Sequence, residues 1–69
     1  MAASLVKRSF SLAGHRTSVA LEAEFWAVID DAAQKQAISL ASLVAQIDAG
    51  RGTRPLASAL RLYALAARQ

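Results

Sequence analysis

The stretch GHRTSVALEAEFW, residues 14–26, changes its apolar period at a single point. Residues 16–21 alternate, as expected for a strand with one buried face, because successive side chains of a strand point to opposite faces. One face would carry Thr17, Val19 and Leu21, and the other Arg16, Ser18 and Ala20. From Glu22 onward the apolar residues recur at spacings of three and four, which is typical of a helix with one apolar stripe. The stretch therefore predicts a short strand that runs directly into a helix, with no obvious partner strand in its own chain.

A weaker alternation precedes this stretch. In LVKRSFSL, residues 5–12, one face would carry Val6, Arg8, Phe10 and Leu12, and the other Lys7, Ser9 and Ser11. The following AGH is typical of a turn or bend, because Gly14 is free to take a positive φ. We predict strand structure within residues 5–21.

Three helices are predicted after the strand, over residues 22–37, 39–49 and 54–68. Ser39 suits the N-cap of the second helix, because its hydroxyl can accept from a free amide one turn later. Gly50 or Gly52 suits the left-handed position that ends this helix. Pro55 fits the first turn of the third helix, with Thr53 or Arg54 as its cap.

Two adjacent aromatic residues set the phase of the first helix. Phe25 begins an apolar stripe with Val28 and Ile29, and Trp26, its neighbour on the helix, cannot point into the same core. We predict that Phe25 is buried. Trp26 is predicted to be partly exposed, or packed against another subunit or the N-terminal segment.

The size of the chain favours an assembly. It has 69 residues, no cysteine and one histidine, so it forms one domain without a disulfide or a thiolate metal site. A single core rarely suffices at this length. At 55% hydrophobic residues, and with a third helix that is apolar nearly all round, the chain carries more apolar surface than such a monomer can hide. We therefore predict a homodimer or a higher oligomer.

Charge is segregated along the chain. Residues 1–21 contain one lysine and two arginines, residues 49–69 contain four arginines, and neither stretch contains an acid, whereas residues 22–48 contain all five acids and one lysine. Basic ends suggest a polyanionic partner, and an ordinary solvated surface is the alternative. The serine-rich, acid-free N-terminal segment resembles a transit peptide, but it runs directly into the strand pattern. We expect a soluble, cytoplasmic protein that does not bind a membrane.

The sequence offers little for catalysis. No motif surrounds its serines to support a nucleophile–base pair, and GHRTS lacks the glycine spacing and lysine of a phosphate-binding loop. Asp30 and Asp31 are adjacent on a helix and so point in different directions. We predict no enzyme, no metal and no cofactor. His15 is interpreted as a turn residue or a phosphate contact.

The order of these elements resembles a known superfamily. RTSVALEAEFW, followed by AISLASLVAQI, is similar to the ribbon-helix-helix superfamily of bacterial DNA-binding proteins, the group of the Arc and Met repressors. The runs KRSFSLAGHRTSVALEAEFW, ISLASLVAQID and SALRLYAL resemble a family of short bacterial proteins with that domain. The resemblance covers roughly residues 7–66. It implies a mainly α fold, an intertwined homodimer in which the strand pairs with its copy from the other subunit.

The resemblance also implies a function and a set of contacts. The two-stranded ribbon would enter the major groove of double-stranded DNA. Base contacts are then expected from the outward face, Arg16, Ser18 and Ala20. Phosphate contacts are expected from Lys7, Arg8 and His15, and from the start of the second helix, Ser39, Leu40 and Ala41. The expected dimer core comprises Val19, Leu21, Phe25, Ile29, Leu43, Val44, Ile47, Leu60 and Tyr63.

Two features depart from the superfamily pattern. A third helix follows a Gly-rich break, and the segment LVKRSFSL could add a strand beside the ribbon. We expect a dimeric transcriptional regulator, associated with the nucleoid. The alternatives are an assembly module that keeps the dimer fold and binds a protein partner, and an antitoxin-type autorepressor. The antitoxin is less favoured, because such proteins usually carry a long toxin-binding tail.

Overall fold

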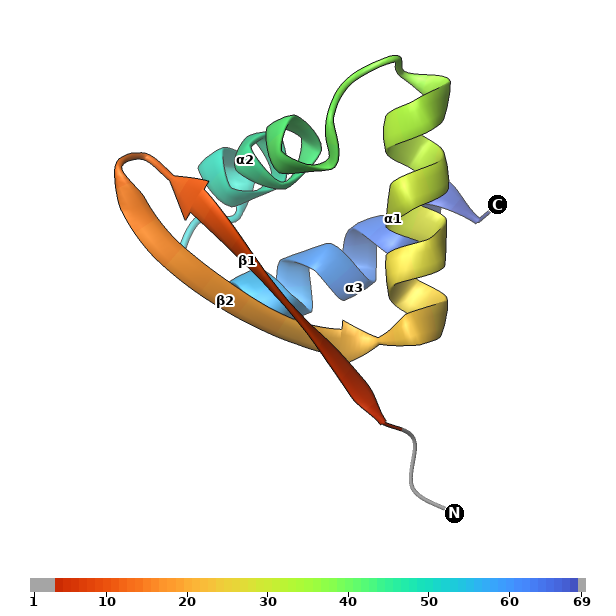
Figure 1. Cartoon of the computed structure of the whole chain (residues 1–69), viewed down its shortest axis with the longest axis horizontal. Coiled ribbons are helices and arrows are strands. Elements are labelled where there is room, and N and C mark those ends of the chain that lie inside the picture. Colours follow the sequence, from red (N-terminus) through yellow and green to blue (C-terminus); the bar gives the residue numbers. More distant parts are fainter. Residues whose placement is uncertain (1–3, 69) are drawn as a thin grey trace.

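A β-ribbon followed by three helices makes up the protein, as seen in a computed structural model that describes residues 4–68 (Figure 1). The strands are β1 (Leu5–Leu12) and β2 (His15–Glu22). The helices are α1 (Ala23–Lys35), α2 (Leu40–Gly50) and α3 (Leu56–Ala67). This is a ribbon-helix-helix arrangement with a third helix.

The two strands form an antiparallel hairpin within one chain, with Leu5 opposite Glu22 and Leu12 opposite His15. The connection is Ala13 and Gly14, whose φ values of 50° and 81° are both positive. Consecutive positive φ values are typical of the type I′ turn, whose twist matches that of the flanking strands. The strand of residues 16–21 therefore has a partner in its own chain. The ribbon comes from one subunit, where the resemblance implied one strand from each of two.

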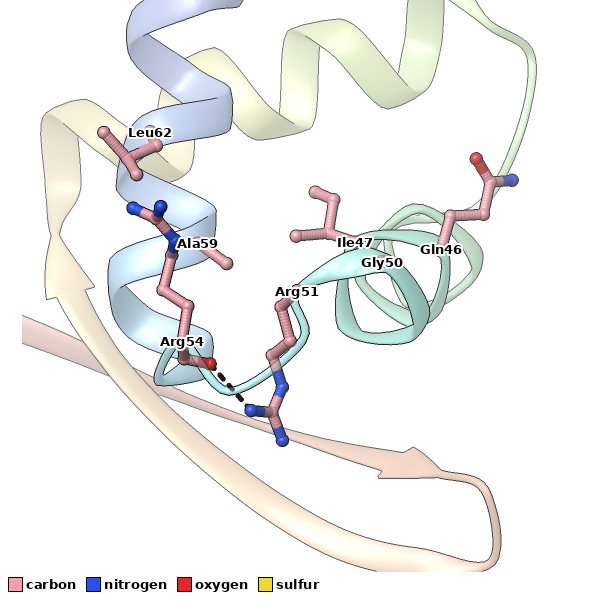
Figure 2. Close-up of a pocket in the computed structure, with 7 residues that line it drawn as sticks. All are labelled: Gln46, Ile47, Gly50, Arg51, Arg54, Ala59 and Leu62. Atoms are coloured by element: carbon pink, nitrogen blue, oxygen red, sulfur yellow. Dashed lines mark hydrogen bonds between the residues drawn. The ribbon is translucent and has the colours of Figure 1, made fainter.

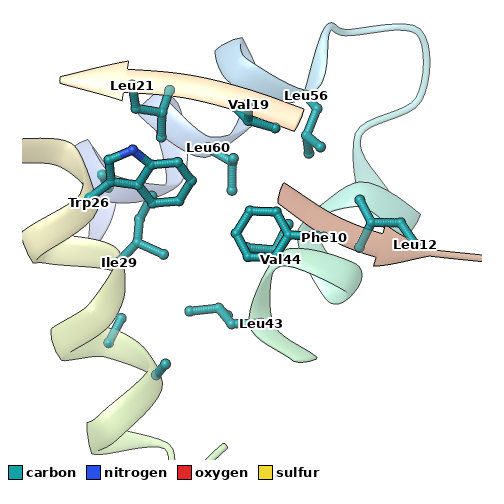
Figure 3. Packing of buried hydrophobic residues seen from close by; sticks show 13 residues of the cluster. Phe10, Leu12, Val19, Leu21, Trp26, Ile29, Leu43, Val44, Leu56 and Leu60 are labelled. Atoms are coloured by element: carbon teal, nitrogen blue, oxygen red, sulfur yellow. The ribbon is translucent and has the colours of Figure 1, made fainter. Parts of the chain in front are cut away.

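The inner face of the ribbon packs on the helices. Its buried side chains are Phe10, Leu12, Val19 and Leu21, which is the alternation expected from the sequence (Figure 3). Helix α2 packs on β1, whereas α1 and α3 pack on β2. The third helix is part of this core, because Leu60 and Ala64 are completely buried. On its other side Leu62 and Leu65 remain 45% and 46% exposed.

Helix α1 is rotated from its predicted phase. Trp26 is 2% exposed, whereas Phe25 is only partly buried, so the prediction that Phe25 is the buried one of the two was wrong. Of the alternatives predicted for Trp26, the structure shows packing against the N-terminal segment, because its ring lies against Arg8 and Phe10 of β1. Trp26 lies three residues before Ile29, and both side chains face the core (Figure 3). The indole can be buried because its one polar atom is satisfied: Nε1 donates to the carbonyl oxygen of Val6 at 2.7 Å.

The helix ends follow local chemistry. Ser39 is the N-cap of α2, as predicted, and its Oγ accepts from the amide of Ser42 at 3.0 Å. At the end of α1, Ala37 takes a left-handed φ of 58°. Its amide donates to Gln34, and the amide of Ile38 donates to Ala33, as in a Schellman motif. Pro55 is the N-cap of α3 and not in its first turn, and Gly52, at φ 63°, follows the end of α2.

The residues expected at a dimer core lie in or against the core of the single chain. Six are buried there: Val19, Leu21, Ile29, Leu43, Val44 and Leu60. The other three are partly buried and pack against these: Phe25, Ile47 and Tyr63. Their contact with a second subunit stays a prediction.

Candidate nucleic-acid interface

The side of the ribbon that faces away from the helices is polar. We call it the outer face, and it is formed by Lys7, Ser9 and Ser11 of β1 with Arg16, Ser18 and Ala20 of β2. These residues are opposite one another in three pairs, Lys7 with Ala20, Ser9 with Ser18, and Ser11 with Arg16. All are exposed except Ala20, which is half-buried. The three residues expected to contact bases thus lie together on one exposed face.

The pairs are close enough to act as one surface. A two-residue turn makes Leu12 and His15 the first hydrogen-bonded pair, so every outer-face pair is of the non-hydrogen-bonded kind, in which side chains approach more closely. The hydroxyl oxygens of Ser9 and Ser18 are 2.9 Å apart and share a hydrogen bond. The outer face therefore presents a row of hydroxyls between two cations.

Lys7 and Arg16 are the cations of this face, and neither has an acidic partner among the described residues. Four other cations do form ion pairs: Arg8 with Asp30, Lys35 with Asp31, Arg51 with Asp48, and Arg61 with Glu22. Arg54, in the connection between α2 and α3, and Arg68, at the C-cap of α3, are exposed and likewise unpaired within the described chain. Four of the eight Lys and Arg side chains thus form ion pairs within the chain, whereas Lys7 and Arg16 on the outer face do not pair with any described acid.

Glu22 lies at the end of β2, in the same alternation as the outer face. A backbone hydrogen bond at its own position, and then the Arg61 guanidinium, lower the pKa of this carboxyl below its ordinary value of 4.5. Arg61 Nε donates to Glu22 Oε1 at 3.0 Å. The negative charge at this end is therefore matched by a cation from α3.

Arg8 is placed away from the outer face. Its Nη1 donates to Asp30 Oδ1 at 3.1 Å, and its guanidinium carbon lies 4.9 Å from the centre of the Trp26 ring. Strand alternation is the reason, because Arg8 belongs to the same face as Phe10 and Leu12. The structure therefore does not group Arg8 with Lys7 as a second phosphate contact.

The other expected phosphate contacts lie on separate elements. His15 is exposed beside the hairpin turn, in the alternation of Val19 rather than that of Arg16. Ser39 begins α2, where it accepts from the amides of Ser42 and Leu43. The amides of Leu40 and Ala41 are then the free donors that every helix start exposes, at the positive end of its dipole. None of these residues belongs to the outer face.

Ser9 and Ser11 were missed as site residues. The signal was present, because the weak alternation of residues 5–12 already grouped them with Lys7. What was lacking was the two-residue turn, which places this row directly opposite Ser18 and Arg16.

Beyond this surface, the described residues have a hollow between two helices but no cluster of metal ligands. Within the described chain, no three His, Cys, Asp or Glu residues are close enough to hold a metal ion. A hollow of about 380 Å³ lies between α2 and α3, lined by Ile47, Ala59 and Leu62 with two arginines at its edge (Figure 2). One of these, Arg51, is held by Asp48 and by the carbonyl of Arg54, each at 2.7 Å. The hollow brings together no acid–base pair or nucleophile.

None of the helices in residues 4–68 is long and apolar enough to cross a membrane. A comparison with curated proteins, and one with solved structures, returned no match. A comparison with family models returned the ribbon-helix-helix domain, matched over residues 5–67. Domains of this family typically form dimers, bind DNA and regulate transcription, and they are generally not enzymes. The hairpin, the helices and α3 all fall within the matched residues, and the chain belongs to the ribbon-helix-helix domain family.

Proposed function

We propose that this protein is a dimeric, sequence-specific regulator of transcription that binds double-stranded DNA through the outer face of its ribbon. The observation that carries the proposal is the outer face itself, which is largely exposed, rich in hydroxyls and flanked by two cations without an acidic partner in the described part of the chain. The major groove is wide enough to admit a two-stranded ribbon. Since the hairpin is complete within one chain, each subunit would bring its own ribbon.

The side chains divide into two roles. Arg16 would donate two hydrogen bonds to a guanine, and Ser18 would donate to or accept from a neighbouring base. Ala20 would offer apolar contact only. Lys7, at the other end of the face and opposite Ala20, would contact a phosphate. The amides of Leu40 and Ala41 would supply a further phosphate contact from the start of α2.

The family and the surface both support a homodimer. Ribbon-helix-helix domains typically dimerise, and α3 leaves Leu62 and Leu65 nearly half exposed. A twofold dimer would place two outer faces on two half-sites of an operator.

The test is the salt dependence of binding, measured by fluorescence anisotropy on a labelled duplex. Phosphate contacts make affinity fall steeply with salt, by a slope of about 0.9 per contact. We expect the double variant Lys7→Ala/Arg16→Ala to bind more weakly than the parent. Its log affinity should also fall less steeply with log salt.

The matched control is Arg54→Ala/Arg68→Ala, which also removes two exposed cations that have no acidic partner among residues 4–68, but from positions away from the ribbon. We expect it to bind nearly as the parent does. Equal losses of affinity in the two double variants would show that binding depends on the net charge of the protein and not on the outer face. If neither variant nor parent binds DNA, the chain is better described as a protein-binding module.

A further inference from the structure

One buried indole holds β1 against α1. Trp26 Nε1 donates to the carbonyl of Val6 at 2.7 Å. The guanidinium carbon of Arg8 lies 4.9 Å from the ring centre, and the ring of Phe10 lies 6.0 Å away at a tilt of 39°. Val6, Arg8 and Phe10 are alternate residues of one strand. Trp26 thus contacts the inner side of β1 at three successive inward positions.

Asp30 extends this grip by one helical turn. Its two carboxylate oxygens accept from Arg8 Nη1 at 3.1 and 3.3 Å. Asp30 lies four residues after Trp26, so both side chains leave α1 on the same face. We call the set formed by Val6, Arg8, Trp26 and Asp30 the Trp26 clamp.

The clamp acts on the part of the hairpin that most needs support. An isolated two-stranded hairpin is only marginally stable, and strand ends open most easily. Val6 pairs with Leu21 at the end of the ribbon away from the turn. A slip of one residue in β1 would send its inward row outward. The hydrogen bond to the main-chain carbonyl of Val6 and the contacts of Arg8 with Trp26 and Asp30 oppose that slip.

Lys7 lies between the two clamped residues. Strand alternation places Lys7 on the face opposite to Arg8, the outer face, where it is exposed and opposite Ala20. The contacts of the clamp retain the guanidinium of Arg8 on the helix side. Of these two adjacent cations, Lys7 is therefore exposed on the outer face, whereas Arg8 is held on the helix side.

We propose that Trp26 and Asp30 are positioning residues for DNA binding, which hold Lys7 in place as a phosphate contact and keep Arg8 away from the DNA. The inference rests on the proposed function, because it names what sets the geometry of the same surface.

The experiment measures the slope of log affinity against log salt on a labelled duplex of mixed sequence. Trp26→Phe keeps an aromatic ring beside Arg8 and Phe10 but removes the donor to Val6. We expect Lys7→Ala to lower the slope by about 0.9, the value of one phosphate contact. Trp26→Phe should lower it by a similar amount, and the double variant should show no further loss. If Lys7→Ala still lowers the slope by about 0.9 when Trp26 is already replaced by Phe, the proposal is wrong.

Two controls separate positioning from general loss of structure. Tyr63→Phe also removes one aromatic hydrogen-bonding group, since Tyr63 Oη accepts from Gln36 Nε2 at 2.8 Å, but this pair lies away from β1. Its slope should match that of the parent. The loss caused by Arg16→Ala should be the same with and without Trp26→Phe, because Arg16 is on the other strand.

Asp30→Asn provides a second route if Trp26→Phe does not fold. It weakens the hold on Arg8, and the Lys7 contribution should again shrink. In the otherwise unchanged protein, adding Arg8→Ala to Lys7→Ala should not lower the salt dependence of binding any further. A further drop of about 0.9 would make Arg8 a phosphate contact itself and contradict the proposal.

A measurement without DNA distinguishes failure of the positioning role from failure of the proposed function. Amide hydrogen exchange in the first half of β1 should be faster in Trp26→Phe and Asp30→Asn than in the parent. Faster exchange with an unchanged slope would show a clamp that does not serve DNA binding, while the proposed function stands. If neither Lys7→Ala nor Arg16→Ala changes binding, the proposed function fails whatever the exchange shows.

Discussion

Ser9 and Ser18 join their hydroxyls across the ribbon, with their oxygens 2.9 Å apart on the outer face. Cross-strand pairs of this kind contribute roughly 0.2–1 kcal/mol to stability. We expect Ser9→Ala and Ser18→Ala each to lower the free energy of unfolding by an amount in this range. The double variant should lose less than the sum of the two. Urea denaturation of the four proteins checks this, and strict additivity would show that the hydroxyls do not interact in solution.

Arg16 should determine the base preference of the outer face. It is exposed, unpaired within the described chain and opposite Ser11. We expect Arg16→Ala to lose about 1–3 kcal/mol of binding at one base position and to accept other bases there. Selection of binding sites from a randomised duplex, before and after the substitution, measures the change. Arg68→Ala is the control, and its selected sequence should equal that of the parent.

Trp26 should dominate the stability of the helical layer. It is 2% exposed and hydrogen-bonded to Val6, whereas its neighbour Phe25 is only partly buried, 5.9 Å from the guanidinium carbon of Arg61. Truncating a fully buried aromatic residue costs about 3–5 kcal/mol. We expect Trp26→Ala to cost that much and Phe25→Ala clearly less. Thermal and urea unfolding of both variants provide the comparison, and the reverse order would contradict the observed phase of α1.

Glu22 should make stability depend on pH in the acidic range. Its pKa in the folded protein is lowered from 4.5 by a backbone hydrogen bond and by Arg61. The unfolded chain therefore binds more protons there than the folded chain. The stabilisation is present above about 4.5, the ordinary value, and is lost as pH falls through the lower folded pKa. In Glu22→Gln, the free energy of unfolding should depend less on pH in this acidic range. An unchanged profile would mean that the ion pair with Arg61 does not persist in solution.

The melting temperature should rise with protein concentration. A dimer that unfolds to separate chains is stabilised by mass action, so dilution favours the unfolded state. Differential scanning calorimetry over a wide concentration range tests this, with sedimentation equilibrium to establish the mass. A melt independent of concentration, from a species of monomer mass, would exclude the dimer.

The alternation of residues 16–21 predicted the outer face well, because the side-chain period of a strand is fixed by its backbone. Val19 and Leu21 are buried and Arg16 and Ser18 exposed, as expected. Ser39 was equally readable, because capping is a local interaction between a hydroxyl and an amide one turn away.

Long-range features could not be read in this way. The hairpin turn uses Ala13 at a positive φ, where asparagine or aspartate before glycine is the usual signal. Ala13 gives no such signal, so the sequence predicts LVKRSFSL only as a possible additional strand and not as the partner of residues 16–21. The ion pair of Arg8 with Asp30 joins residues 22 apart in the chain. The burial of Trp26 depends on a contact of the same long-range kind, since the carbonyl that satisfies its indole belongs to β1.

Forming the ribbon from a single chain frees it from a symmetry constraint. In a ribbon assembled from two identical strands, one codon change alters two positions related by the dyad. Here β1 offers Lys7, Ser9 and Ser11, whereas β2 offers Arg16, Ser18 and Ala20. The two strands can therefore vary independently, and one substitution alters one position per hairpin. Under the proposed function, each subunit would therefore bring two different strands to the DNA, and any palindrome in its target would have to come from the relation between subunits.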